Sequence, residues 1–447
     1  MFQYKMSKDI PLTSEIIKKV IEKYRTNEVP RLNKLNKYYN AENEILSKTR
    51  IDENAPNNKV VHPYASYITD TLTGYFMGEG ATYSSLEDDA VDELKMILTY
   101  NDEQDENMEL AKDMSIFGLS VELLYLDEDA MIRLKRIDPR EVVVIYDDTL
   151  NEDILYGFRF YLYEDIIENK TYTMIEVYTS DRIITYKSDE NLNSLSFVSE
   201  IPHFFGMCPL IVFSNNEEQI GDFEQVIPLI DAYDKMESNS LDDFDYFVDA
   251  YMVLTGLNAD SDDIKSMKEN RIILLDNDSD AKWLIKNSPD EAIENVKNRI
   301  DKDIHKFSKT PDMSDEAFGS NASGVSIRYK TLPMENVVGI KERKFKKGLQ
   351  RRIELIYVIL ALKGSLYDWR SIDISFTRNL PTNDTEIADM VNKLSNVAST
   401  ETLLAQLPFV DDVNKEMERI EEEKKKNPFY DVRLGLNGED EEENGEG

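Results

Sequence analysis

The chain has 447 residues, with 88 acidic against 52 basic side chains and a formal net charge of −36. Such a composition excludes proteins that wrap nucleic acid with their whole surface, because those need broad Lys and Arg footprints. The single cysteine, Cys208, excludes an intramolecular disulfide, and the longest apolar run, residues 353–364, is about half of the roughly 20 residues that a membrane span needs. We therefore expect more than one domain and no contact with a membrane.

The first quarter of the chain has the pattern of amphipathic helices. From residue 14 to 46, apolar residues recur at helical spacing, with a break at Pro30. Similar patterns follow at 63–77, 88–100 and 107–117. From 121 to 213 the chain changes to short runs that are rich in β-branched and aromatic residues and separated by turn residues, which predicts a mostly antiparallel sheet.

Two helices with a small module between them are expected next. The first covers 216–247, with Pro228 near its start. Residues 251–287 have the pattern of a compact α/β module, and a second helix follows a capping sequence at Ser288 and ends at Pro311. The arrangement predicts a helical stalk with a knob at its tip. The second helix carries an apolar stripe, which we expect to be buried against the first helix or against a neighbouring subunit: Ile293, Val296, Ile300, Ile304 and Phe307.

A long helix is expected after a small loop at 318–324. It runs to about residue 363, and its apolar side consists of Val338, Phe345, Leu349, Ile353, Ile356 and Leu360. A strand at 371–381 follows, and then helices at 383–397, 400–407 and 411–426. The acidic end of the chain, 438–447, has no apolar residue, and we expect it to be disordered.

The long helix contains a local excess of positive charge in this acidic chain. Residues 341–352 hold seven basic side chains: Lys341, Arg343, Lys344, Lys346, Lys347, Arg351 and Arg352. Two interpretations remain open. These side chains neutralise acidic neighbours, which the total of 88 acids in the chain favours, or they contact the phosphates of a nucleic acid.

Motifs for catalysis or cofactor binding are not visible, so we expect no enzyme, no cofactor and no metal centre. His62, His203 and His305 lie far apart and are interpreted as structural or surface residues. An acidic turn at 276–280 lacks the glycine and glutamate of a calcium loop, although a weak divalent-cation site there stays open. Three acids on the first stalk helix point in different directions and are interpreted as a solvated face: Asp242, Asp243 and Asp245.

Several segments together resemble the portal proteins of tailed bacteriophages that infect Gram-positive bacteria. The resemblance runs in order from about residue 14 to 430. One segment is "SGVSIRYKTLPMENVVGIKERKFKKGLQRR" at 323–352, and the order and spacing of all the segments carry the resemblance. The other segments are 74–85, 138–148, 213–247, 379–394 and 399–423.

The resemblance implies a ring of about twelve copies at one vertex of the virion capsid, assembled in the host cytoplasm. Double-stranded DNA would pass through the ring during packaging and ejection. The implied partners are the terminase, the head–tail adaptor, and the scaffold and major capsid proteins.

The resemblance also implies an α+β, multi-domain portal-type fold with a helical stem, an α/β clip, a mixed wing and a helical crown. The wing would be 1–215, the stem 216–247 and 288–311, and the clip 248–287. A tunnel loop, the long wing helix and a returning strand would occupy 312–381, and the crown 382–430. The tail at 431–447 lies outside the resemblance, and we expect it to be disordered because of its acidic composition. The tunnel loop would lie at roughly 318–333 and face DNA through Gly319, Ser320, Asn321, Ala322, Ser323 and Gly324.

Two functions from other classes remain open. One is an acidic intracellular scaffold or adaptor with no role on DNA, which the charge alone would also fit. The other is a metal-dependent nuclease that uses the Asp-rich segments.

Overall fold

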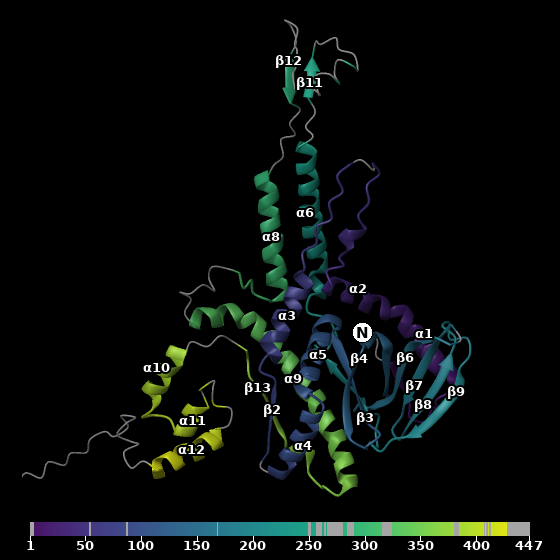
Figure 1. Ribbon diagram of the computed structural model, residues 1–447, viewed down its shortest axis with the longest axis vertical. Helices are drawn as coiled ribbons and strands as arrows, with labels where there is room; N and C mark the ends of the chain where they lie inside the picture. The colour runs from purple at the N-terminus through teal and green to yellow at the C-terminus, as the bar shows by residue number, and fades with distance from the viewer. Residues whose placement is uncertain are drawn as a thin grey trace, which may run out of the picture. The chain divides into compact units, whose positions relative to one another are not determined.

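The chain forms two compact units, one of residues 1–318 with 329–379 and the other of 319–328 with 380–447. Helices and several separate sheets occur together, which confirms the α+β class (Figure 1). The computed structural model describes residues 4–52, 55–85, 88–167, 169–248, 252–255, 262, 265, 280–283, 290–314, 324–379, 384–405, 407, 410 and 413–426.

Five helices of the first unit confirm the helical patterns near the N-terminus. The break at Pro30 separates the first two, since Pro30 stands in the first turn of α2. The side chain of Thr13 caps α1 by accepting a hydrogen bond from the amide of Ile16. The helices are α1 (Ser14–Asn27), α2 (Val29–Tyr39), α3 (Tyr64–Met77), α4 (Asp88–Tyr100) and α5 (Glu103–Phe117).

The strand-rich stretch folds into two sheets, where the sequence pattern indicated one. The larger has the order β1-β5-β6-β7-β8-β9, and only β1 runs parallel to its neighbour. Its strands are β1 (Tyr4–Met6), β5 (Val142–Asp147), β6 (Ile154–Asp165), β7 (Lys170–Tyr178), β8 (Arg182–Ser188) and β9 (Ser196–Pro202). The smaller has the order β10-β3-β4, with β3 (Leu119–Leu126), β4 (Ile132–Ile137) and β10 (Leu210–Ser214).

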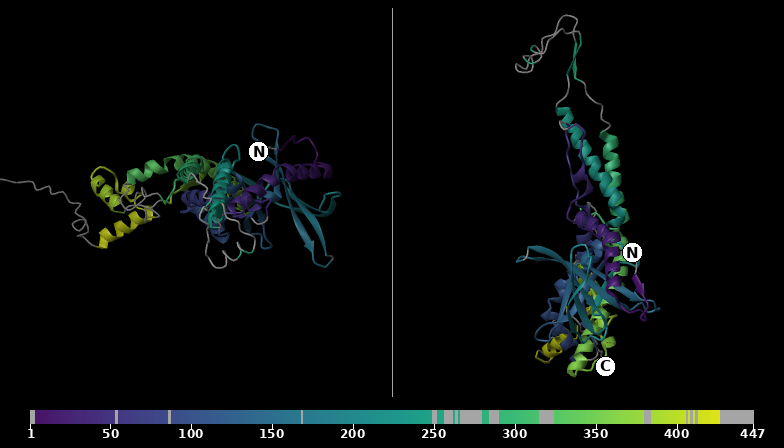
Figure 2. Two further views of the ribbon diagram at one scale, coloured as in Figure 1. Left: turned by 90° about the horizontal axis from the view of Figure 1, so that it is seen from above. Right: turned by 90° about the vertical axis from the view of Figure 1, so that its right-hand side faces the viewer.

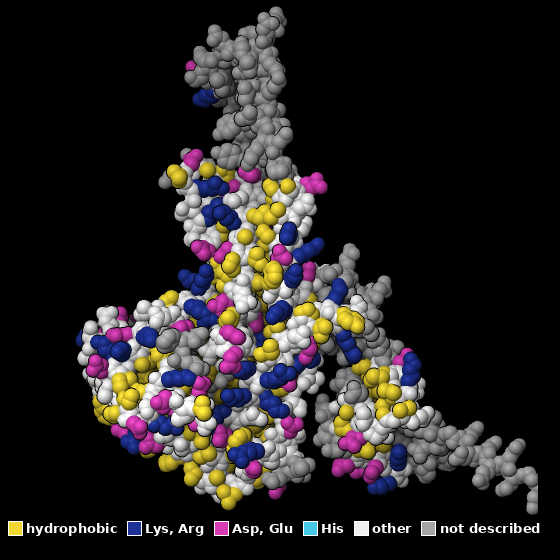
Figure 3. All heavy atoms as spheres, turned by 180° about the vertical axis from the view of Figure 1, so that it is seen from behind, with side chains coloured by type: hydrophobic (Ala, Val, Ile, Leu, Met, Phe, Trp, Pro, Cys, Tyr) yellow, Lys and Arg dark blue, Asp and Glu magenta, His cyan; other side chains and the backbone are white. Residues whose placement is uncertain are grey.

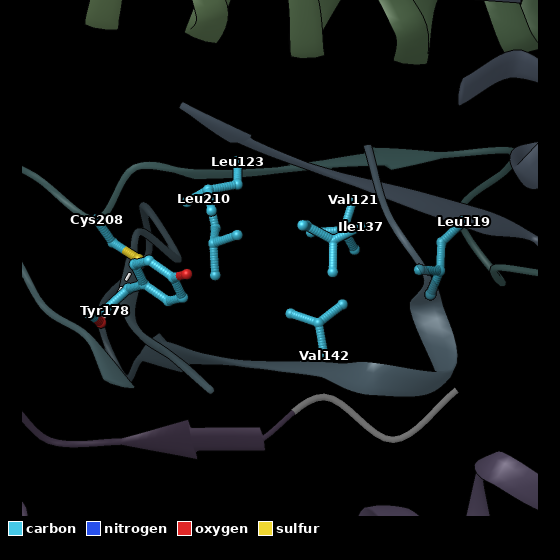
Figure 4. Packing of buried hydrophobic residues seen from close by; sticks show 8 residues of the cluster. All are labelled: Leu119, Val121, Leu123, Ile137, Val142, Tyr178, Cys208 and Leu210. Atoms are coloured by element: carbon cyan, nitrogen blue, oxygen red, sulfur yellow. Dashed lines mark hydrogen bonds between the residues drawn. The ribbon is translucent and has the colours of Figure 1, made fainter. Parts of the chain in front are cut away.

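A shared apolar core joins the two sheets. Tyr178 and Val142 belong to the larger sheet, and side chains of β3, β4 and β10 pack against them (Figure 4). Cys208 lies in the same core, with its thiol directed at the carbonyl oxygen of Tyr178. The cluster consists of Leu119, Val121, Leu123, Ile137, Val142, Tyr178, Cys208 and Leu210.

The two stalk helices lie side by side in the structure (Figures 1 and 2). They are α6 (Ile227–Val248) and α8 (Asp290–Ser308), and Lys297 of α8 forms an ion pair with Glu237 of α6 at 3.1 Å. Between them in the chain, β11 (Met252–Thr255) and β12 (Asp280–Trp283) form an antiparallel pair. The acidic turn at 276–280 lies outside the described residues except for Asp280, the first residue of β12.

The long helix α9 (Gly324–Lys363) packs its predicted apolar side into the first unit. All six residues of that side are buried: Val338, Phe345, Leu349, Ile353, Ile356 and Leu360. Gly348 permits a close approach to β10, because a Cβ at this position would collide with the ring of Phe213. After α9, strand β13 (Asp373–Phe376) pairs antiparallel with β2 (Ala81–Ser84).

The second unit contains three further helices. They are α10 (Asp384–Leu394), α11 (Thr400–Leu404) and α12 (Val413–Lys426), near the positions that the sequence pattern predicted. Ser399 caps α11 by accepting a hydrogen bond from the amide of Thr402. The acidic tail at 431–447 lies outside the described residues. Among the described helices, none is both long and apolar enough to cross a membrane.

Candidate functional site

The candidate residues that the sequence indicated lie in three regions: the expected tunnel loop, the basic segment of α9 and the paired helices α6 and α8. Five of the expected loop residues lie outside the described residues: Gly319, Ser320, Asn321, Ala322 and Ser323. Gly324 is the first residue of α9, and the helix continues through Pro333. An extension of the loop to Pro333 was therefore wrong, because 324–333 are helical.

Two cations of the basic segment lie inside the protein. Lys341 is 2% exposed and pairs with Asp222, and Arg352 is fully buried against Glu122 and Glu103. A buried charge needs a partner of opposite sign, and both cations have one within this chain. Lys341 and Arg352 therefore neutralise acidic neighbours, as the first of the two interpretations has it, and these neighbours belong to the same chain and not to another subunit or to DNA.

The remaining cations of the segment are closer to the surface. Lys344 pairs with Glu217, Lys346 with Asp373 at 3.1 Å, and Arg351 with Glu354 at 2.6 Å one turn along α9. The hydrogen bond from Lys344 is the main cause of a lowered pKa of the Glu217 carboxyl, to which the nearby charge of Lys347 adds. Among the described residues, no direct ion pair involves Arg343 or Lys347.

Arg352 is the centre of a buried polar cluster. Its Nε and Nη2 donate to the two carboxylate oxygens of Glu122 at 2.8 and 2.7 Å, and its Nη1 donates to Glu103 at 2.8 Å. The hydroxyl of Tyr83 donates to the same Glu103 oxygen at 2.5 Å. Burial raises the pKa of Glu122, and the charge of Arg352 opposes that rise. The cluster ties α9 to α5, β2 and β3.

The expected stripe on α8 divides into buried and exposed residues. Ile304 is fully buried, Ile293 and Ile300 are half-buried, and Val296 and Phe307 are exposed. The neighbouring α6 also exposes Leu241 and Phe244, the latter by 62%. Figure 3 shows hydrophobic side chains gathered along the paired helices. In the single chain, the two helices therefore retain an apolar surface that is not buried between them.

Asp242 on α6 was predicted to lie on a solvated face of the helix. In the structure it is buried, so this prediction was wrong for Asp242. Its carboxylate is buried and accepts from Lys48 and Arg50, each at 2.6 Å. It also accepts from the backbone amide and side-chain amide of Asn58 at 2.6 and 3.0 Å. Burial alone would raise the pKa of Asp242, but these hydrogen bonds outweigh it and lower the pKa to about 2. Asp242 thus anchors the segment at 48–58 to α6.

The three histidines do not all lie apart: the rings of His62 and His305 both lie beside the ring of Tyr64, whereas His203 lies beside Phe205. His62 Nδ1 is 2.9 Å from Asp234, and His203 Nε2 is 3.1 Å from the carbonyl oxygen of Thr179. His305 lies near the end of α8 together with Asp301 and Asp312. This group was not predicted from the sequence, although the spacing of Asp301 and His305 by one helical turn was a visible signal.

Comparison with known proteins gives consistent matches over most of the chain. A family model described as "Phage portal protein, SPP1 Gp6-like" matches residues 18–428. The portal protein of Bacillus phage SPP1 is 27% identical over 438 residues, which cover 91% of this chain and 86% of the relative. The portal protein of Clostridium phage phiCD119 is 24% identical over 416 residues, which cover 87% of this chain and 91% of the relative.

Proposed function

The chain belongs to the SPP1 Gp6-like family of phage portal proteins, and we propose that about twelve copies form a closed ring around a channel for double-stranded DNA. A portal protein is a component of the virion, and the ring would stand at one vertex of the capsid. DNA would pass through it during packaging and again during ejection. The ring would nucleate procapsid assembly with the scaffold and major capsid proteins, bind the terminase, and later bind the head–tail adaptor.

The domain assignment follows the same proposal. The N-terminal helices and the two sheets within 1–215 would form the wing, and α6 and α8 the stem. The strand pair β11 and β12 would belong to the clip at 248–287, and the three helices of the second unit to the crown at 382–430. The positions of α6 and α8 beside each other, and of β11 and β12 between them in the chain, support this assignment.

The observation that best supports the ring is the apolar surface of the paired helices. Val296 and Phe307 on α8 are 46% and 54% exposed, and Phe244 on α6 is exposed as well. Exposed apolar side chains gathered along one part of a protein, as Figure 3 shows for these helices, are typical of an interface. In a ring, each copy contributes one such surface to each neighbour, and closure leaves none of them free.

The charges of the chain support a conduit that does not hold DNA tightly. With a formal charge of −36 per chain, the wall of the channel would repel a polyanion, and repulsion would keep the polyanion mobile. Phosphate contacts from many cations would bind DNA strongly at low salt. The most buried cations of the basic segment, Lys341 and Arg352, are paired with acids of the same chain and offer no such contacts.

Purified, untagged full-length protein provides the test. We expect negative-stain images of rings with a central hole, and native mass spectrometry should give a closed oligomer of one dominant size. A single-chain mass at every protein and salt concentration would overturn the proposal and would favour the acidic scaffold or adaptor.

A further inference from the structure

Three side chains of the types that bind metal ions lie close together at the C-terminal end of α8. Asp301 and His305 lie one helical turn apart and therefore share a face of the helix. Asp312 follows shortly after the helix ends. One ligand atom from each residue lies within 4.8 Å of the other two, and all three side chains are half-buried. None of these residues has a role in the ring or in the channel as proposed above.

The imidazole of His305 is oriented as a metal ligand requires. Its Nδ1 lies 3.1 Å from the carbonyl oxygen of Thr310, which can only accept a hydrogen bond, so Nδ1 carries the proton. In the neutral ring, Nε2 then has its lone pair available. A histidine ligand whose other nitrogen donates to a backbone carbonyl is the usual arrangement in metal sites.

The distance between the first two ligand atoms also fits a shared ion. Nε2 of His305 is 3.6 Å from Oδ1 of Asp301. That distance exceeds a good hydrogen bond. Two ligands bound tetrahedrally at about 2.1 Å from one ion lie about 3.4 Å apart, close to the spacing that these two atoms already have.

Surrounding groups hold the three side chains in place. The hydroxyl of Tyr64 on α3 donates to Asp301 at 2.6 Å, and the amide and hydroxyl of Ser314 donate to Asp312 at 2.9 and 2.6 Å. The rings of Tyr64 and Tyr67 contact the His305 ring edge-on. Close by, the hydroxyl oxygen of Thr310 is buried without a hydrogen-bond partner among the described residues. Such outer partners orient ligands and strengthen metal binding.

We propose that Asp301, His305 and Asp312 bind one divalent transition-metal ion of the zinc or manganese type. One imidazole nitrogen with two carboxylates suits these ions, whereas magnesium and calcium prefer oxygen ligands alone. Three protein ligands leave the remaining positions to water. The ion joins the end of α8 to the segment that leaves it, and through Tyr64 it also stabilises the contact with α3. The inference rests on this geometry and not on ring formation.

Metal titration of the full-length, untagged protein tests the site. The protein is treated with a chelator, dialysed, and titrated with Zn²⁺ against a chromophoric competitor in excess Mg²⁺. We expect one ion per chain that Asp312→Asn and His305→Gln each weaken by about tenfold or more. Asp303→Asn, on the same helix but outside the group, is the matched control and should leave the affinity unchanged.

Two further measurements make the result independent of folding defects. Co²⁺ in place of Zn²⁺ should give visible d–d absorption that Asp312→Asn alters, and Tyr64→Phe should weaken binding while circular dichroism stays that of the parent. A Mn²⁺ titration followed by electron paramagnetic resonance shows whether the site prefers manganese or zinc.

The inference is overturned if the parent protein binds no Zn²⁺ at micromolar concentration, or if Asp312→Asn and His305→Gln bind as the parent does. Normal zinc binding by a protein that stays monomeric would overturn only the ring.

Discussion

Arg352 of α9 and Glu122 of β3 form a fully buried ion pair in which two guanidinium nitrogens donate to the two carboxylate oxygens. The residues are 230 positions apart in the chain. Glu103 accepts a hydrogen bond from the third guanidinium nitrogen, so the single cation of Arg352 pairs with two buried carboxylates. The long helix is thus held to the body of the protein by charge as well as by its apolar side.

Removal of Arg352 should destabilise the chain severely. Arg352→Met leaves two buried carboxylates without their cation, and a broken buried pair costs about 3–5 kcal/mol. We expect little soluble protein, or a large fall in the urea midpoint by circular dichroism. Arg351→Met, which removes a partly exposed arginine next to it, is the control and should change the midpoint only slightly. Equal midpoints for both variants would contradict the role of Arg352.

Substitutions on the paired helices α6 and α8 should show which of their apolar residues are needed for folding and which only for ring assembly. Phe244→Asp and Val296→Asp alter exposed residues, so the chain should stay folded while ring formation fails. Ile304→Asp places a carboxylate in a fully buried position and should unfold the chain itself, at a cost of several kcal/mol. Analytical ultracentrifugation and circular dichroism distinguish the two outcomes. Met96→Asp on α4, another exposed apolar residue, is the matched control. Normal rings from Phe244→Asp and Val296→Asp would show that this surface is not the interface.

The surface cations of α9 should affect assembly more than stability. The pair between Lys344 and Glu217 is exposed, and such pairs contribute about 0–1 kcal/mol. Lys344→Glu with Lys347→Glu should leave the unfolding midpoint nearly unchanged but weaken ring assembly, most at low salt where screening is least. The swap Lys344→Glu with Glu217→Lys keeps the net charge and should assemble normally. If the double reversal assembles normally and only DNA packaging fails, the cations face DNA or the packaging motor.

Low pH should reduce the stability that the ionised Asp242 carboxylate contributes to the fold. Its folded pKa of about 2 lies below the ordinary aspartate value, so its stabilising contribution is complete above about pH 4 and is lost as the pH falls through about 2. A shift of this size, reduced for solvent screening, corresponds to about 1 kcal/mol. Asp242→Asn should therefore lower the urea midpoint at pH 7, and the difference from the parent should shrink between pH 4 and pH 2. A difference that stays constant with pH would exclude a role for the charge.

The thiol of Cys208 should not react with thiol reagents while the protein is folded. Burial raises the pKa of its thiol to about 12, and the thiolate is the reactive form. We expect no labelling by a maleimide at pH 7 in native buffer and one label per chain in denaturant. Ser188→Cys, at a buried strand end, and Ser180→Cys, in the turn between β7 and β8, provide a protected and an accessible control. Rapid native labelling of Cys208 would show that the core between the sheets opens.

Periodicity predicted the parts of the fold that depend on local sequence. The apolar side of α9 from Val338 to Leu360 is buried as expected, because burial of one face requires a helical repeat that is visible in the sequence. The partners of Lys341, Arg352 and Asp242 were not predictable. These depend on which distant segments the fold brings together, and charge patterns along one helix do not contain that information.

Short strands were also beyond the reach of sequence patterns. β1 has only three residues, too few for an alternating pattern, and β2 has only four, the shortest run in which alternation can be recognised. No strand was predicted from the sequence between the helical patterns at 63–77 and 88–100, where β2 lies. Its partner β13 was expected as a strand at 371–381, but the pairing between them could not be read from either segment alone.

The pairing of β2 with β13 has a consequence for how the chain acquires its structure during synthesis. The hydroxyl of Thr82 donates to the carbonyl oxygen of Ser375, 293 residues further along the chain. A strand cannot satisfy its backbone groups before its partner has been translated, and contacts between distant residues form slowly. The first unit can therefore complete its folding only when most of the polypeptide has left the ribosome. Fragments that end before residue 373 should therefore expose the edge of β2 and associate nonspecifically.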